Sequence, residues 1–125
     1  ALEPEPELAE VLRGIEGVDV RQAYAQALPE LLAEWGHPVA HRVVSSLPFA
    51  AWSDALQDEI LDAVLSCMPD DGVMVTFTYV HSQLLPAARK LEAKLRRRFA
   101  TLSRSPTVLR NVPPAFVWIA EGPQR

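Results

Sequence analysis

Hydrophobic and polar residues alternate along this chain with two different periods, one typical of helices and the other of strands. Apolar residues recur every three or four positions in four segments, which predicts helices over residues 5–13, 27–35, 53–67 and 84–99. Short runs rich in β-branched and aromatic residues predict strands over residues 18–21, 41–46, 73–80, 107–110 and 116–120. The expected order is therefore α-β-α-β-α-β-α-β-β.

This order predicts an α/β fold, in which helices cover a mostly parallel sheet. Residues 73–80 are β-branched or aromatic almost throughout, which is typical of an interior strand. Pro113 and Pro114 stiffen the turn between the last two strands, so these strands are expected to form an antiparallel hairpin. At 125 residues and 49% hydrophobic composition, with no internal repeat or linker, residues 1–125 are expected to form a single domain.

Two of the helices carry apolar faces that predict the core. In the helix over 53–67, for which Ser53 is the expected N-cap, this face comprises Leu56, Ile60, Val64 and Cys67. In the helix over 84–99 it comprises Leu84, Ala88, Leu91, Leu95 and Phe99. The basic residues of the second helix are expected to lie largely outside: Arg89, Lys90, Lys94, Arg96 and Arg97. Cys67, the only cysteine, is expected in the core.

Charge is distributed unevenly although the net charge is only −4. Residues 1–71 hold 14 of the 16 acidic residues, whereas residues 72–125 hold nine of the 12 basic ones. A basic half joined to an acidic half indicates a polyanionic partner, either a phosphate backbone or an anionic membrane surface. A solvated helix face is the alternative interpretation.

Other classes of protein are disfavoured by the composition. No apolar run approaches the roughly 20 residues that span a bilayer, and the acidic beginning of the chain is unlike a signal peptide. A cytoplasmic protein is therefore expected. The three histidines have no ligand-like spacing with Cys67 or with one another, so no metal site is predicted.

The strand over 41–46 ends in the sequence Ser-Ser-Leu-Pro-Phe at 45–49. A proline after a buried strand forces the chain out of the sheet, so the next side chain projects over the carboxyl end of the strand. Ligands of open α/β sheets bind at that edge. The ring of Phe49 beside a serine hydroxyl suits a flat or cationic amine, while the alternative places Phe49 in the core below a surface turn.

Motifs along nearly the whole chain resemble class I S-adenosylmethionine-dependent methyltransferases. They comprise the order of elements, the turn at 45–49, the Pro-Asp-Asp-Gly turn at 69–72, the strand end at 77–79 and the closing segment Asn-Val-Pro-Pro-Ala-Phe-Val-Trp at 111–118. Within this family the chain is most similar to bacterial phospholipid N-methyltransferases, which are relatives of the ribosomal RNA adenine dimethylases. The resemblance implies a Rossmann-like sheet and S-adenosylmethionine as the cofactor.

The resemblance also implies roles for particular residues. Glu3 matches the acid that accepts hydrogen bonds from the cofactor ribose, and Tyr24 stands where the family commonly has an acid beside the adenine. Ser45 belongs to the turn that borders the cofactor. The acceptor turn that orients the target amine comprises Ser46, Leu47, Pro48 and Phe49. Tyr79, or His81 beside it, is the expected proton acceptor at the end of the next strand.

The chain departs from the family at its amino-terminal side. The Gly-rich loop that follows the family's first strand has no counterpart, because none of the five glycines forms a Gly-x-Gly. The first strand and its helix are therefore expected to be missing from the domain. Because that strand lies in the middle of the family's sheet, its absence leaves two open hydrogen-bonding edges. We expect a homo-oligomer or a second chain that completes the sheet.

The resemblance implies an S-adenosylmethionine-dependent N-methyltransferase whose acceptor is an amine. The adenine-modifying relatives usually have Asn at the position of Ser46, and a serine lacks the planar amide that pairs with a base. This difference favours an aliphatic amine, such as that of a phosphatidylethanolamine headgroup. The basic half then favours an anionic membrane surface, with the chain peripheral at the inner membrane face. The alternative is a non-catalytic methyltransferase-like module that binds a membrane surface, RNA or a partner subunit, so enzyme activity stays open.

Overall fold

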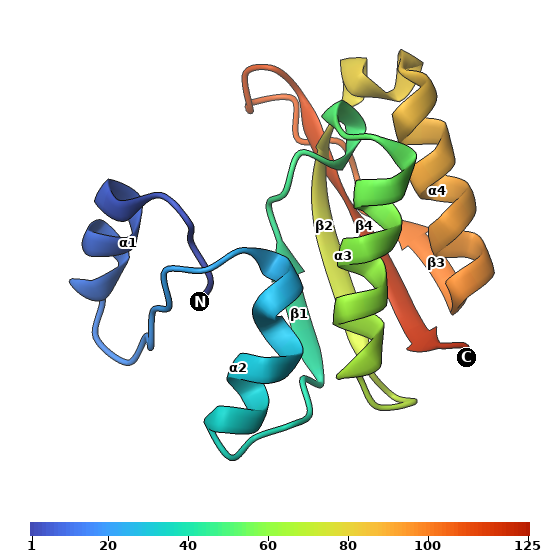
Figure 1. The fold of residues 1–125 in the computed structure, drawn as a ribbon. Coiled ribbons are helices and arrows are strands. Elements are labelled where there is room, and N and C mark those ends of the chain that lie inside the picture. The colour runs from blue at the N-terminus through green and yellow to red at the C-terminus, as the bar shows by residue number, and fades with distance from the viewer.

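The computed structural model describes residues 1–125, and a four-stranded sheet forms its centre (Figure 1). The strands are β1 (Arg42–Ser45), β2 (Val73–Tyr79), β3 (Phe99–Arg104) and β4 (Ala115–Pro123), in the order β1-β2-β4-β3. The β1–β2 pair is parallel, whereas the β2–β4 and β3–β4 pairs are antiparallel. The predicted α/β class with an antiparallel carboxyl-terminal hairpin is confirmed, in a sheet that is mixed.

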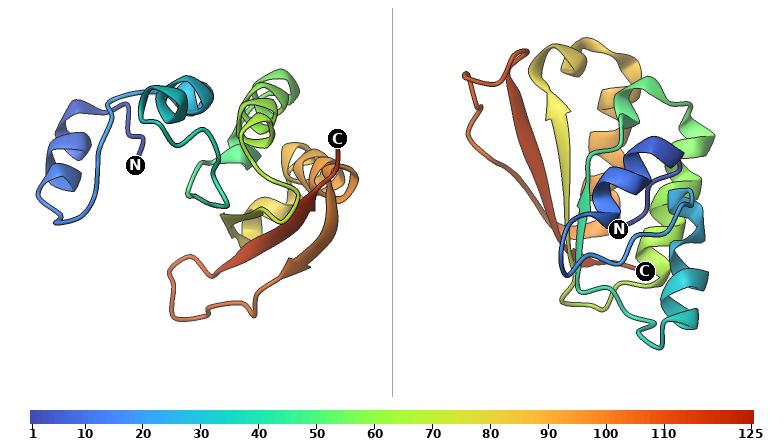
Figure 2. Two further views of the ribbon diagram at one scale, coloured as in Figure 1. Left: turned by 90° about the horizontal axis from the view of Figure 1, so that it is seen from below. Right: turned by 90° about the vertical axis from the view of Figure 1, so that its left-hand side faces the viewer.

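Three helices cover one face of this sheet. They are α2 (Leu28–Glu34), α3 (Asp54–Ser66) and α4 (Pro86–Arg98), and Figure 2 shows that the opposite face of the sheet carries no helix. The first helix, α1 (Pro6–Arg13), stands apart on the amino-terminal side. Three short 3₁₀ turns, at 25–27, 49–51 and 80–84, connect the elements. No helix combines the length and the apolar character that a membrane crossing requires.

The core lies between the sheet and α3 and α4. Along β2 and β4, alternate residues are buried towards these helices: Met74, Thr76, Thr78, Phe116, Trp118 and Ala120. The expected helix faces are largely confirmed, since the following residues are buried: Ile60, Val64, Cys67, Ala88, Leu91, Leu95 and Phe99. Leu84 was expected in the core, but it is exposed because a 3₁₀ turn occupies 80–84 and α4 begins only at Pro86.

The partner strand of the hairpin differs from the prediction. Strand β3 begins at Phe99 directly after α4, whereas residues 107–110 contribute only the single bridge from Val108 to Ala115. Phe99 takes extended backbone angles (φ −128°, ψ 148°), so it belongs to the strand. Its buried side chain is at once the last of the apolar face of α4 and the first of β3. Phe99 fits both the helical and the strand spacing of apolar residues. The sequence pattern therefore assigned it to the helix, and the strand that begins there was not predicted.

The strand expected over 18–21 is reduced to one parallel bridge. Arg21 pairs with Leu2, its N–H donating to the carbonyl of Ala1 at 2.9 Å and its carbonyl accepting from the N–H of Glu3 at 3.1 Å. This short pair is not joined to the four-stranded sheet.

An ion-pair ladder joins α3 to α4. Acids spaced four residues apart on α3 face bases with the same spacing on α4, and the members are Asp54, Asp58, Asp62, Lys90, Lys94 and Arg98. Lys94 lies at the centre, with its Nζ 2.8 Å from Asp54 Oδ1 and 3.2 Å from Asp58 Oδ1. The expectation that Lys94 points outwards is wrong, because its side chain is 6% exposed and also donates to the Asp54 carbonyl. Part of the uneven charge is thus used inside the molecule.

Replacing the buried ammonium group is predicted to destabilise the fold. We expect Lys94→Met to lower the free energy of unfolding by about 1–3 kcal/mol, since the Asp54 carbonyl and two carboxylates lose their shared donor. Lys90→Met is the control, because Lys90 is 59% exposed and 4.0 Å from Asp54, and its effect should stay below about 0.5 kcal/mol. Urea unfolding measures both, and equal effects would contradict the central role of Lys94.

The ladder also predicts a dependence of stability on pH. The hydrogen bond from Lys94 holds the pKa of Asp54 below its ordinary value of 3.8. The stabilising contribution is therefore complete above that value and is lost as the pH falls through the lower pKa of the folded state. Between about pH 6 and about pH 2.5, the urea midpoint of Asp54→Asn should fall less than that of the parent chain. Asp70→Asn, at an exposed carboxyl without an ion pair, should follow the parent chain.

Candidate functional site

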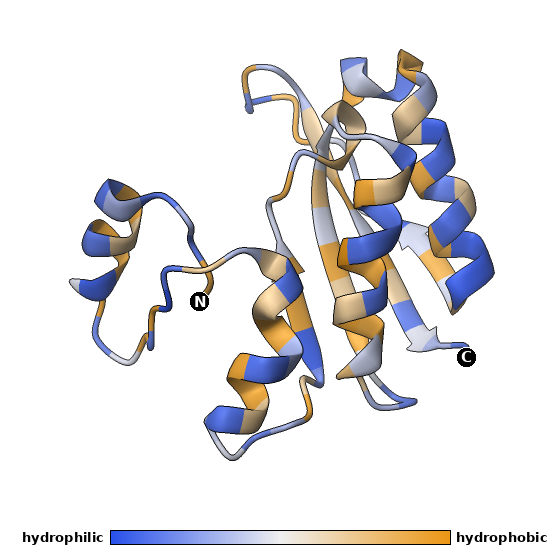
Figure 3. Ribbon diagram, in the orientation of Figure 1, coloured by the Kyte–Doolittle hydropathy of each residue, from blue (hydrophilic) through white to orange (hydrophobic).

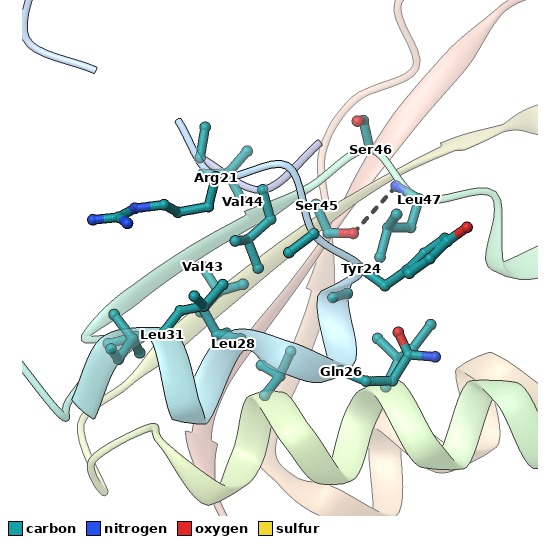
Figure 4. A pocket seen from close by; sticks show the side chains of 18 of the residues that line it. Arg21, Tyr24, Gln26, Leu28, Leu31, Val43, Val44, Ser45, Ser46 and Leu47 are labelled. Carbon is teal, nitrogen blue, oxygen red and sulfur yellow. Dashed lines mark hydrogen bonds between the residues drawn. The ribbon is translucent and has the colours of Figure 1, made fainter. Parts of the chain in front are cut away.

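A cavity of about 690 Å³ lies between the amino-terminal residues, α2 and β1 (Figure 4). Hydrophobic residues make up 19 of the 26 that line it, so its walls are apolar. Polar side chains border it where β1 ends, among them Ser45, Ser46 and Tyr24. An apolar cavity with a few polar groups at one end has the general character of a small-molecule site.

The turn after β1 is shaped by its first serine. Ser45 is buried at the end of β1, and its Oγ accepts a hydrogen bond from the N–H of Leu47 at 3.2 Å. This bond directs the chain out of the sheet before Pro48. Ser46 and Pro48 are exposed, while Leu47 is half-buried. Ser46 therefore presents its hydroxyl at the surface beside the cavity.

Phe49 packs into the core directly after this turn. Its side chain is 2% exposed, and its ring meets that of Trp52 edge to face with 5.6 Å between the centroids. The sequence left open whether this ring projects over the strand end or folds into the core, and the structure shows the second arrangement. The ring still borders the cavity, so its contact with a bound amine stays a prediction.

Gln57 holds the turn in place, and the sequence analysis missed it. Its buried amide Nε2 donates to the carbonyl of Phe49 at 2.8 Å and to that of Ala87, in the first turn of α4, at 3.0 Å. One side chain of α3 thereby joins the turn after β1 to the start of α4. The signal was available, since Gln57 occupies a position of the apolar face shared with Ile60, Leu61 and Val64, where a polar residue needs a buried partner.

The remaining predicted site residues are only partly brought together. Tyr24 lines the cavity and is 71% exposed. Glu3 is half-buried outside the lining, and its Oε1 accepts a hydrogen bond from the N–H of Glu5 at 2.9 Å. Tyr79, at the end of β2, stacks on His81 with 5.6 Å between the ring centroids and also lies outside the lining. The cavity thus gathers Tyr24, Ser45, Ser46, Leu47 and Phe49, but not Glu3, Pro48 or Tyr79.

Comparison with known proteins bears on the fold. No protein-family model matches the chain, and no curated protein sequence matches it. Among solved structures, an rRNA methylase from Streptococcus thermophilus matches 99% of this chain and 72% of its own, with a TM-score of 0.67 and 15% identity. The Dnmt2 methyltransferase of S. pombe matches with a TM-score of 0.63 and 12% identity, over 100% of this chain and 43% of its own.

The chain has the fold of the class I methyltransferases. A protein of Streptococcus mutans assigned to the methyltransferases and solved in complex with SAH matches as well, with a TM-score of 0.56 and 16% identity over 97% of this chain and 74% of its own. At these identities the likeness describes the fold, and it does not distinguish a phospholipid enzyme from an adenine dimethylase.

The hydrogen bonds of Gln57 lead to a prediction about the turn. We expect Gln57→Leu to lower the free energy of unfolding by about 1–3 kcal/mol, because the carbonyls of Phe49 and Ala87 each lose one hydrogen bond in a buried place. Exchange of the backbone amides should quicken first at residues 49–52, because the Gln57 side chain is hydrogen-bonded to the first of them. Gln22→Leu, at an exposed residue, is the control and should change neither quantity. Unchanged exchange at 49–52 in Gln57→Leu would contradict this role.

Proposed function

We propose that this chain is an S-adenosylmethionine-dependent N-methyltransferase that acts on a phospholipid headgroup. The observation that carries the proposal is an exposed aliphatic and basic rim at the sheet edge where the turn after β1 lies. The rim comprises Leu84, Leu85, Arg89, Leu109, Arg110 and Val112.

The rim is formed by two segments that meet at the carboxyl end of β2. Leu84 and Leu85 precede α4 and are 81% and 45% exposed, while Leu109 and Val112 in the β3–β4 loop are 76% and 92% exposed. The N–H of Val80 donates to the carbonyl of Pro114 at 2.9 Å, which ties the two segments together. Figure 3 shows hydrophobic residues in both segments. Because Gln57 bonds to both the turn and α4, the rim adjoins the turn.

The chemistry of the rim favours a lipid surface. Exposed aliphatic side chains insert among acyl chains, and nearby arginines are attracted to anionic headgroups. Arg89 and Arg110 take part in no ion pair, whereas Lys94 and Arg98 are used within the α3–α4 ladder.

The cavity and the turn fit the demands of methyl transfer. S-adenosylmethionine supplies an electrophilic methyl group, and Glu3, Tyr24 and Ser45 would hold it in and beside the apolar cavity. The hydroxyl of Ser46 and the carbonyls of the turn would accept hydrogen bonds from the amine and so orient its lone pair. Tyr79 or His81 would accept the proton that the amine loses. The buried ring of Phe49 would face the methylated nitrogen from the cavity side.

RNA is a second candidate substrate, because the Streptococcus thermophilus structure with the same fold is an rRNA methylase. An RNA-binding chain would lose affinity steeply as salt increases, since it would displace counterions from the phosphates.

The two substrates are separated by a labelled-methyl assay. The chain is given labelled S-adenosylmethionine with phosphatidylethanolamine vesicles that contain anionic lipid, or with ribosomal RNA, and the label is expected in the lipid. The double variant Leu109→Asp and Val112→Asp should lower lipid labelling about tenfold or more, because a charge opposes insertion of the rim. Val39→Asp, in the loop before β1 at the other edge, is the matched control and should keep the parent's labelling. Label in RNA alone, or in neither substrate, would contradict the proposal.

A further inference from the structure

Helix α4 begins without a capping side chain. Leu85 occupies its N-cap position and makes no side-chain hydrogen bond there. At the start of α3, in contrast, Ser53 Oγ accepts a hydrogen bond from the N–H of Leu56 at 3.3 Å. A first turn whose N–H groups lack a cap frays more readily than a capped one. The exposed aliphatic residues at this end of the rim, Leu85 and Leu84 before it, therefore stand on a weakly held helix start.

The turn after β1 packs against the same helix. Residues 49–51 form a short 3₁₀ turn that contacts α4. Within it, the N–H of Ala51 donates to the carbonyl of Pro48 at 2.9 Å, and the N–H of Trp52 donates to that of Phe49 at 3.1 Å. A 3₁₀ turn of this length opens at a small cost in free energy unless neighbouring groups hold it. Its conformation therefore depends on what α3 and α4 contribute.

One side chain joins the start of α4 to the 3₁₀ turn. The amide Nε2 of Gln57 uses one hydrogen on the carbonyl of Ala87 and the other on the carbonyl of Phe49. Gln57 is 0% exposed, so a broken bond is not readily replaced by one to water. When the first turn of α4 unwinds, the amide loses one of the two acceptors that fix its orientation. Stabilising the start of α4 therefore also stabilises the turn.

We propose that contact of the rim with a lipid surface orders the turn at 49–51 through Gln57, so that methyl transfer is faster on a membrane than with dispersed substrate. Insertion of Leu84 and Leu85 among acyl chains holds the uncapped start of α4. The Gln57 amide then keeps both of its acceptors, and the turn that orients the amine stays in one conformation.

Gln57 is in this scheme a positioning residue, because it acts through the turn and touches no reacting atom. The inference rests on the proposed function, since it assigns a regulation to the same rim and the same turn. The cofactor keeps its place in the cavity, whose lining does not include Gln57.

A purely structural role for Gln57 has different consequences. The amide would then contribute the same stability with and without lipid, and vesicles would leave the turn unchanged. Lys94 supplies the matched comparison, because its Nζ also donates to a backbone carbonyl across the two helices, that of Asp54 at 2.8 Å. None of its hydrogen bonds reaches Phe49 or Ala87.

The first test is amide hydrogen exchange of the full chain with and without vesicles of phosphatidylethanolamine and phosphatidylglycerol. Exchange at Ala51 and Trp52 should slow about threefold or more when vesicles are added. The amide of Gly36, in the turn after α2, is the control and should not change. Gln57→Met should still bind vesicles but lose the slowing at 51 and 52, whereas Lys94→Met should keep it.

The second test compares two forms of one substrate. With labelled S-adenosylmethionine, the parent chain should methylate phosphatidylethanolamine in vesicles about tenfold faster than a short-chain phosphatidylethanolamine dispersed as monomers. Gln57→Met should lose most of this ratio through a lower kcat, at an unchanged vesicle concentration for half the maximal rate. Lys94→Met should retain the ratio.

The results that oppose the inference differ from those that oppose the proposed function. Equal rates on both forms of the lipid would overturn the coupling and leave the lipid as the substrate. So would slowing at 51 and 52 that survives in Gln57→Met, or a ratio that Lys94→Met loses equally. Vesicles that do not bind the chain would overturn both proposals.

Discussion

The packing of α3 against α4 is the constraint on which the candidate site depends. The two helices cover the sheet, and two sets of side-chain contacts fix their alignment. Lys94 bridges Asp54 and Asp58 in the middle of the ladder, and the amide of Gln57 donates to the carbonyls of Phe49 and Ala87. The turn after β1 is hydrogen-bonded to Gln57 of α3, and the rim begins at the start of α4. This helix pair therefore positions both the turn and the rim.

The molecule consists of a well-packed part and a part with few internal contacts. From β1 onwards, sheet and helices share one core, with Phe49, Leu61, Leu95 and Phe116 almost completely buried. Before the 3₁₀ turn at 25–27, the chain contributes one parallel bridge and a helix that stands apart (Figures 1 and 2). The cavity lies between them. The turn after β1 therefore sits on a rigid frame, whereas Glu3 and Tyr24, which we propose to hold the cofactor, come from the segment with few contacts.

Part of the uneven charge of the sequence is paired inside the structure. Acids and bases that lie far apart in the sequence pair across the helix interface, as Asp62 does with Arg98 at a separation of 36 residues. A charge used in this way is not available to an external polyanion. Arg89 and Arg110 remain without ion pairs at the rim, and the proposed contact with a lipid surface rests on their place beside exposed aliphatic residues.

The sequence by itself determined the class of the fold and the place of its best-defined turn. Periodic patterns are local, so the helices at 6–13, 28–34 and 54–66 and the strands at 42–45 and 73–79 lie where they were predicted.

Only the tertiary structure decided the features that depend on contacts between residues distant in the sequence. Phe99 satisfies both a helical and an extended pattern, and only pairing with β4 makes it a strand residue. Lys94 was expected on the surface and is buried only because α3 and α4 meet, and the burial of Phe49 against Trp52 likewise follows from packing. The residues packed against a polar side chain decide whether it is buried with hydrogen-bonding partners or solvated. In this chain those residues lie far from it in the sequence.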